Sequence, residues 1–392
     1  MPGTCITSGP LTVKSIFEDN HNWDVFRLTE SANLRDVEIN EVEKMLSCKD
    51  ESRGFFVYRC DSCGTLVTVH FGCNSRICTN CGKNYTDKWA KSLKKTMFNV
   101  PHRHAVLTIP DALWQIVRGN RFLLKVLMDA AIQAINDTIS YRHRNGNLTA
   151  GAIVVLHPFS KDMSFNPHLH ILVTEGGFDR HGRFVHQEYI SYHALRKTWQ
   201  YQVLTRFKAK FPGNMEFSRL VNQLFKKYPK GFYVHLPPES RISNNQRIAR
   251  YVVRYIRHPA IANTRLSQYD GNSVTFWYQN HEDKKKFVTI EVFEFIKALI
   301  QHIPDRNFKM IRYYGAYSRR VKRRFSEYLL RSLKQATFED FITKPNKWAP
   351  LCPKCGEKMI FVMYAKGPPK DNTVFGCKLT DWIHPMLSRG YS

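Results

Sequence analysis

The sequence predicts an α+β protein that also binds metal, and three observations support this. Short apolar runs typical of strands occur at 104–110, 151–156, 167–173, 232–236 and 273–278. Longer segments with apolar residues at helical spacing occupy about 111–143, most of 186–260, and 287–303. Six of the ten cysteines fall between Cys48 and Cys81. The strands near 104–173 around the helix at 111–143 predict a mixed sheet-and-helix core.

Three consecutive domains are expected from these landmarks. Residues 1–90 combine helical spacing, as in Leu34 to Met45, with the Cys-rich segment. Residues 100–325 hold the predicted sheet and its helices, and residues 326–392 form a C-terminal tail. At 392 residues and 43% hydrophobic content, the chain is long enough to bury a large core.

Two histidines share a face of one predicted strand. In the strand 167–173 the period of two puts His168 and His170 on one side, and Leu169 and Ile171 on the other. Such a pair can also serve core packing. Two imidazoles side by side are nevertheless half of a site for a divalent metal.

Two tyrosines lie one helical turn apart. Tyr251 and Tyr255 are at i and i+4 in a helix-compatible run, so both phenols can point to one place. On an apolar helix face this spacing is also typical of packing. With the histidines, it indicates metal-assisted phosphoryl transfer with tyrosine as the nucleophile, where cations such as Arg254 or Arg257 would favour the phenolate.

The charge of the chain favours a polyanionic partner. It contains 59 Lys and Arg against 33 Asp and Glu, a formal net charge of +26. Such an excess repels itself unless a polyanion is nearby, so DNA is the expected partner.

A cytoplasmic, nucleoid-associated protein is expected. No apolar run approaches the roughly 20 residues of a membrane span, and the first residues lack a basic stretch before an apolar core. In a reducing compartment clustered cysteines favour metal binding over disulfides.

Two cysteine pairs have the spacing of zinc knuckles. Cys60-x-x-Cys63 and Cys78-x-x-Cys81 are each followed by a turn-forming glycine, and together they predict one tetrahedral structural zinc site. Cys48, His70 and Cys73 remain, either to complete a second site or to replace one ligand. The spacing leaves one zinc ion or two open.

A further knuckle, Cys352-x-x-Cys355, lies near the C-terminus, with Cys377 and His384 downstream. It is a candidate for a second zinc site, although only two ligands are well placed.

A basic segment with tyrosines follows the last predicted helix. Five cations lie within Arg319–Arg324, which alone is typical of a solvated helix face as often as of a binding surface. Neighbouring tyrosines offer stacking planes, so the segment predicts contact with a DNA strand. The candidate contacts are Arg265, Arg312, Tyr313, Tyr314, Arg319, Arg320, Arg323 and Arg324, together with Arg254 and Arg257, and Tyr317 adds a further ring.

No P-loop signature is present, so no nucleotide cofactor is expected. Exchange of one phosphodiester for another conserves bond energy and needs none.

Five separated motifs, in order, resemble the two-tyrosine HUH rolling-circle transposases of bacterial insertion sequences. They are Cys73 to Trp89, Arg103 to Pro110, Leu156 to Gly177, Ala260 to Leu266 and Ile311 to Gly315. The resemblance covers about residues 15 to 320. It implies a replication-initiator-like HUH endonuclease domain, a central antiparallel sheet with helices, behind a small zinc-binding domain.

The resemblance also implies roles for named residues. His168 and His170 match the metal-binding histidines, here for Mg²⁺ or Mn²⁺, and Tyr251 and Tyr255 match the nucleophiles that become joined to a 5′ phosphate. The expected substrate is the single-stranded or hairpin end of an element. Such sites usually have a third ligand shortly before the histidine pair, where many relatives carry glutamine at the position of Lys161. Asp162 is our first choice for this ligand and His157 the second.

Two other functions remain open at this point. A rolling-circle plasmid replication initiator would use the same residues. A DNA-binding repressor with a decayed nuclease is the non-enzymatic alternative, disfavoured because both histidines and both tyrosines are present.

Overall fold

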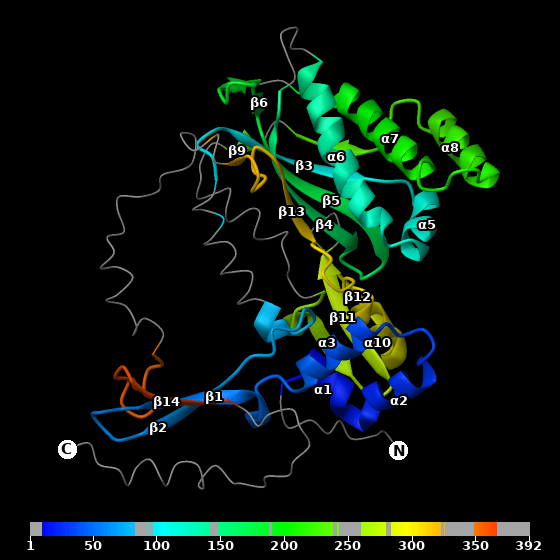
Figure 1. Ribbon diagram of the computed structural model, residues 1–392. Coiled ribbons are helices and arrows are strands. Elements are labelled where there is room, and N and C mark those ends of the chain that lie inside the picture. The colour runs from blue at the N-terminus through cyan, green and yellow to red at the C-terminus, as the bar shows by residue number, and fades with distance from the viewer. Residues whose placement is uncertain are drawn as a thin grey trace. The chain divides into compact units, whose positions relative to one another are not determined.

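The computed structural model describes residues 10–82, 93, 97–141, 148–187, 190–237, 241–242, 260–279, 284–322, 325 and 349–366. The chain forms two compact units, one of residues 1–46 and 74–341 and one of residues 47–73 and 342–392 (Figure 1). The α+β class predicted from the sequence is confirmed. The division differs from the three consecutive domains expected, because the segment 47–73 is grouped with C-terminal residues.

An antiparallel sheet forms the centre of the larger unit. Its strands, in spatial order, are β13 (Ile311–Gly315), β4 (Gly151–Phe159), β5 (Phe165–Thr174), β3 (His102–Thr108) and β8 (Val234–His235), and β9 (Arg241–Ile242) also pairs with β3. β4 and β5 form a hairpin and pair from Ala152↔Val173 to Phe159↔Phe165. Both strands are rich in β-branched residues, which pack well on a pleated surface.

Helices cover one face of this sheet (Figure 1). They are α5 (Trp114–Gly119), α6 (Leu123–Ser140), α7 (Tyr192–Lys208) and α8 (Met215–Lys227). Leu169 and Ile171 of β5 are fully buried in the shared core. The long helix expected at 111–143 is interrupted, because Asn120 leaves helical geometry between α5 and α6. A 3-10 turn, Asp111–Leu113, precedes α5.

The opposite face carries a smaller apolar cluster. Ile153, Val155 and Leu172 pack there against Phe98 and Tyr317. Beside this face lies a short two-stranded ribbon of β6 (Gly176–Phe178) and β7 (Phe184–His186).

The N-terminal helices and a later helix, α10, pack on a second, three-stranded sheet in the same unit. The helices are α1 (Val13–Glu18), α2 (Asn22–Thr29), α3 (Asp36–Leu46) and α10 (Val292–Ile300), and the strands are β10 (Leu266–Tyr269), β11 (Ser273–Gln279) and β12 (Lys285–Glu291). Short 3-10 turns span Asp19–His21 and Asn263–Arg265. Phe26 contacts Phe293, and the Asn22 side chain donates to the Tyr269 hydroxyl at 2.7 Å.

The helix expected at 287–303 is therefore shorter than predicted. Residues Lys285–Glu291 form an edge strand in register with β11, from Gln279↔Lys285 to Ser273↔Glu291. The helix, α10, starts only at Val292, and its apolar residues follow helical spacing from there.

The smaller unit contains a three-stranded antiparallel sheet in the order β14-β1-β2. Its strands are β1 (Gly54–Arg59), β2 (Leu66–His70) and β14 (Ile360–Lys366), and a 3-10 turn, Glu51–Arg53, precedes β1. β14 pairs along all of β1, from Gly54↔Lys366 to Arg59↔Ile360. β14, from the C-terminal part of the chain, thus completes a sheet whose other two strands, β1 and β2, lie on either side of Cys60 and Cys63 in the sequence.

Among the described residues, every helix is too short or too polar to span a lipid bilayer.

Candidate metal centres

Three histidines meet on the β4–β5 hairpin. In the register His157 lies opposite His168, and Val155 lies opposite His170, so all three side chains share one face of the sheet. Their ligand nitrogens lie within 4.8 Å of one another, and each residue is half-buried. The pairing of two strands, rather than one strand alone, therefore assembles the group.

Hydrogen bonds orient two of these rings. His168 Nδ1 lies 2.7 Å from the carbonyl oxygen of Asn166, so it donates there as the N–H and leaves Nε2 as the lone-pair nitrogen. His170 Nδ1 lies 3.0 Å from Nε2 of His104 on β3, and the two rings stack. Partners of this kind are typical around metal-binding histidines, because they fix the tautomer and the ring orientation.

The electrostatics of the hairpin favour the neutral form of His168 and His170. Burial lowers the pKa of His170, and the neighbouring His157, His168 and His104 lower it further. Burial also lowers the pKa of His168, and that of His104 to about 4. Neutral imidazole is the form that binds a metal, so near pH 7 His168 and His170 can bind one without losing a proton.

The preference for Asp162 as the third ligand is corrected by this geometry. Asp162 Oδ1 accepts hydrogen bonds from the backbone N–H and the hydroxyl of Ser164, at 3.0 and 2.7 Å. Its carboxylate closes the turn between β4 and β5, and it is absent from the histidine group. His157, the second choice, occupies the position beside His168.

His104 is the residue of this site to which no role was assigned from the sequence. It lies in His102-Arg-His104, a second pair of histidines at the strand period of two. That pattern marks both as sharing a face, but only the β3–β5 register brings His104 beside His170.

The donor set fits a divalent cation. Three imidazoles fill only part of an octahedral shell and leave positions for water or a phosphate oxygen. An all-nitrogen set suits Mn²⁺ better than Mg²⁺, which prefers oxygen ligands.

Four cysteines from opposite ends of the sequence form a second group. Cys60 and Cys63 follow β1, and Cys352 and Cys355 precede β14. The Sγ atoms lie 3.4 Å apart for Cys60 and Cys355, 3.5 Å for Cys63 and Cys352, and 3.7 Å for Cys63 and Cys355. Tetrahedral zinc with thiolate ligands requires sulfur–sulfur distances of about 3.8 Å. These distances are close to that value and far beyond a disulfide bond.

Both knuckles of this group have the same backbone geometry. Gly64 donates to the carbonyl of Cys60 at 2.8 Å, and Gly356 to that of Cys352 at 2.9 Å. The two glycines have φ of +69° and +77°, which side chains disfavour. A hydrogen bond from the Thr65 hydroxyl, with smaller contributions from neighbouring thiols, lowers the pKa of Cys63 to about 6. The thiolate is the form that binds zinc.

Cys48 and Cys73 belong to the same compact unit as Cys60 and Cys63, and their Sγ atoms lie within 4.8 Å of each other. The Sγ atoms of Cys78 and Cys81 also lie within 4.8 Å of each other. The expected pairing of Cys60–Cys63 with Cys78–Cys81 is wrong, because Cys60 and Cys63 have Cys352 and Cys355 as partners. His70 is not part of that group, and its ring packs against Phe55.

Two of the tyrosine rings predicted to contact DNA make contacts inside the protein instead. Tyr314 lies on the helix-covered face and donates to Asp129 Oδ1 at 2.8 Å. The Tyr317 ring is buried, with its hydroxyl 2.7 Å from His102 Nε2. For Tyr314 the reason is strand alternation: Tyr313 lies on the opposite face of β13 and is exposed, so Tyr314 points toward the helices.

Arg265 is a clamp within the protein. Its Nε donates to the carbonyl of Trp277 at 2.7 Å and its Nη2 to that of Lys161 at 2.6 Å. Arg312 is half-buried over the Phe308 ring, whereas Arg319 and Arg320 are exposed. The other predicted residues lie outside the described part of the chain: Tyr251, Tyr255, Arg254, Arg257, Arg323, Arg324, Cys377 and His384.

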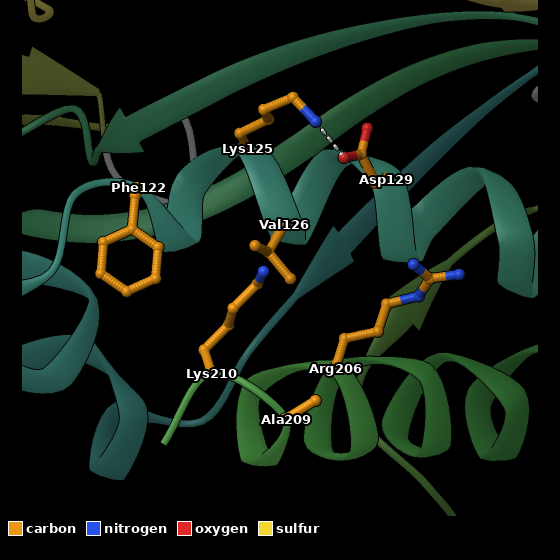
Figure 2. Close-up of a pocket in the computed structure, with 7 residues that line it drawn as sticks. All are labelled: Phe122, Lys125, Val126, Asp129, Arg206, Ala209 and Lys210. Atoms are coloured by element: carbon orange, nitrogen blue, oxygen red, sulfur yellow. Dashed lines mark hydrogen bonds and ion pairs between the residues drawn. The ribbon is translucent and has the colours of Figure 1, made fainter. Parts of the chain in front are cut away.

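A cavity of about 450 Å³ lies between α6 and the end of α7, on the helix-covered side (Figure 2). Figure 2 shows Lys125 bonded to Asp129, at 2.6 Å, with Arg206 and Lys210 on the opposite wall. Its lining includes no histidine, so it is separate from the histidine group.

Two family models of known proteins match this chain, one in its N-terminal part and one in its middle part. A family model described as "Transposase zinc-binding domain" matches residues 19–109, and one described as "Putative transposase" (Y2_Tnp) matches residues 151–325. The chain is 28% identical to the transposase for insertion sequence element IS801 of Pseudomonas savastanoi pv. phaseolicola, over 91% of each protein.

A second relative, "Putative transposase y4qJ" of Sinorhizobium fredii, is 26% identical over 70% of this chain and 73% of its own length. No solved structure matches. The zinc-binding and transposase matches follow each other in the order of the sequence motifs, and the IS801 match spans nearly the whole chain. The chain is therefore similar, over nearly its whole length, to an insertion-sequence transposase, with a match to a transposase zinc-binding domain followed by a match to a transposase domain.

Proposed function

We propose that this protein cleaves one DNA strand at the end of an insertion sequence and transfers it by rolling-circle transposition, through a covalent phosphotyrosine. The observation that carries the proposal is the group of His157, His168 and His170 on one sheet face, with two nitrogens fixed by hydrogen bonds. The match to a transposase family model supports DNA as the substrate. The name of the IS801 relative supports an insertion sequence as the element that is moved.

The reaction would be a transesterification. The phenol oxygen of Tyr251 or Tyr255 attacks the phosphorus, the bond to the 3′ oxygen breaks, and the 5′ phosphate stays joined to tyrosine. The phenol loses its proton and the departing 3′ oxygen gains one, so no external energy source is required. Two tyrosines permit two linkages in succession, one for cleavage and one for strand transfer.

The histidines would hold the reacting phosphate in place through a divalent cation. When bound, Mn²⁺ or Mg²⁺ would polarise a non-bridging phosphate oxygen and offset the charge developing on the 3′ oxygen. His157, His168 and His170 would bind it, while His104 and the Asn166 carbonyl keep the rings oriented. Exposed Arg319 and Arg320 are available to bind phosphates of the incoming strand.

The group of Cys60, Cys63, Cys352 and Cys355 would hold structural zinc. Four thiolates fill a tetrahedral shell and leave no position for substrate. The family match to a transposase zinc-binding domain supports this assignment.

The test is formation of a covalent adduct. Purified protein would be incubated with 5′- and 3′-labelled single strands of its element's ends and Mn²⁺ or Mg²⁺, and separated on a denaturing gel. We expect label on the protein only from the strand 3′ of the cut. Tyr251→Phe and Tyr255→Phe should each retain some adduct, and the double variant none. Adduct formation by the double variant would overturn the proposed nucleophiles.

A further inference from the structure

The outer face of the three-stranded sheet β10–β11–β12 carries exposed aromatic residues. Val274 and Phe276 of β11 point into the core and are fully buried. On the other side of the same strands, Trp277 lies directly opposite Phe287 in the register. The Phe287 side chain is 56% exposed and Trp277 is half-buried. Two aromatic planes are thus adjacent on a surface that the protein core does not cover.

Cations accompany these rings. Lys285 Nζ lies 4.5 Å from the centre of the Trp277 ring, a cation–π contact. Lys284 precedes the edge strand β12 and Lys286 follows Lys285 on it, and both are exposed. Lysines on an edge strand also hinder pairing with another strand. Beside the two rings, however, Lys285 gives the surface a charge complementary to phosphate.

Arg265 ties this surface to the histidine hairpin. Its guanidinium bonds the Trp277 carbonyl and the Lys161 carbonyl together. Lys161 belongs to the turn that joins β4, which carries His157, to β5, which carries His168 and His170. The Trp277 indole N–H also donates to the Thr264 carbonyl at 3.2 Å, which fixes the ring beside Arg265.

We propose that the face formed by Trp277, Phe287 and Lys285, here the Trp277 face, binds single-stranded DNA and directs it toward the histidine group. Bases would stack on the two rings, and Lys285 would bind an adjacent phosphate. A single strand is the fitting ligand because its bases expose their planes, which a duplex hides between stacked pairs. This inference rests on the proposed function for the direction of the strand, but not for binding itself.

The test compares two matched double variants of the full chain. Phe287→Ala with Lys285→Ala removes one exposed ring and one exposed lysine from the Trp277 face. Phe122→Ala with Lys210→Ala removes the same groups from the cavity on the helix-covered side, where Phe122 is 51% exposed (Figure 2). Fluorescence anisotropy would measure binding of labelled oligo(dT) and of a blunt duplex, without divalent metal, and circular dichroism would compare folding.

The Trp277-face variant should bind oligo(dT) on the order of tenfold more weakly or worse, with duplex binding changed much less. Its salt dependence should flatten by about 0.7 in the log–log slope for the lost phosphate contact. The control should bind both ligands as the parent does. Equal losses in both variants, or an unchanged affinity for oligo(dT), would overturn the proposal.

A second pair separates stacking from apolar contact. Phe287→Tyr keeps an aromatic plane and should retain binding, while Phe287→Leu keeps apolar area and should lose it. Equal binding by these two variants would rule out stacking. The adduct assay distinguishes the two proposals: parent protein that forms no adduct but binds oligo(dT) through the Trp277 face contradicts only the proposed reaction.

Discussion

The histidine group and the group of Cys60, Cys63, Cys352 and Cys355 are built in opposite ways. The histidines come from one hairpin, so neighbouring segments of the chain assemble them. The four cysteines come from two segments that lie 289 residues apart or more. Three imidazoles leave coordination positions open for a phosphate, whereas four thiolates close the shell. The number and type of ligands, rather than clustering itself, would thus separate the proposed reactive site from the proposed structural one.

The largest expected effect tests the closed site. Cys355→Ser should lower the zinc content by about one equivalent per chain and destabilise the β14–β1–β2 sheet, since zinc binding supplies on the order of 10 kcal/mol in such sites. Elemental analysis and limited proteolysis between residues 47 and 73 would measure both effects. Full zinc content in this variant would contradict the assignment.

The open site should respond in the reverse manner. His157→Ala should reduce adduct formation by about a hundredfold to a thousandfold, because the reacting phosphate loses electrostatic stabilisation, while zinc content stays unchanged. Asp162→Ala is the control and should remain within a few-fold, since Asp162 only closes a turn. The reverse ranking would restore Asp162 as the third ligand.

A smaller effect is expected from the residue behind the ligands. His104→Ala should raise the Mn²⁺ concentration needed for half-maximal adduct by about tenfold to a hundredfold. His104→Gln keeps a polar partner for His170 and should recover part of this loss. The measurement is adduct yield against Mn²⁺ concentration, and equal curves for parent and His104→Ala would show that His104 merely packs.

The smallest effect concerns a buried histidine outside the metal group. Burial lowers the pKa of His102 to about 4, below the value of about 6.5 expected when unfolded. The unfolded chain therefore binds the proton first as pH falls. The stabilisation is complete above about pH 6.5 and is lost progressively toward pH 4.

At pH 5 this loss amounts to about 2 kcal/mol relative to pH 7. His102→Gln removes the titrating group, so the thermal unfolding midpoint should change less between these pH values than in the parent. A parallel pH dependence in both proteins would exclude His102 as a source of the instability.

Local patterns predicted much of the fold and part of each site. The period of two placed His168 and His170 on one face, and the β4–β5 hairpin confirms that placement. The C-x-x-C-Gly spacing identified the knuckles at Cys60–Cys63 and Cys352–Cys355, whose glycines have positive φ, whereas Gly82 after Cys81 is helical and has none. Local patterns gave the wrong result at Tyr314, because alternation alone does not say which face of a strand the helices cover. They were also wrong at residues 287–291, where an apolar run was assigned to a helix and forms a strand.

By itself the sequence determined the class of the protein: the α+β fold, the types of metal ligands and the excess of positive charge all follow from residue identity and short-range spacing. Only the tertiary structure decided which segments became partners. It joined Cys60 and Cys63 to Cys352 and Cys355, placed His157 beside His168, and brought His104 to His170. The physical reason is that backbone geometry fixes where neighbouring side chains point, while contacts between distant segments depend on which strands pair and in what register.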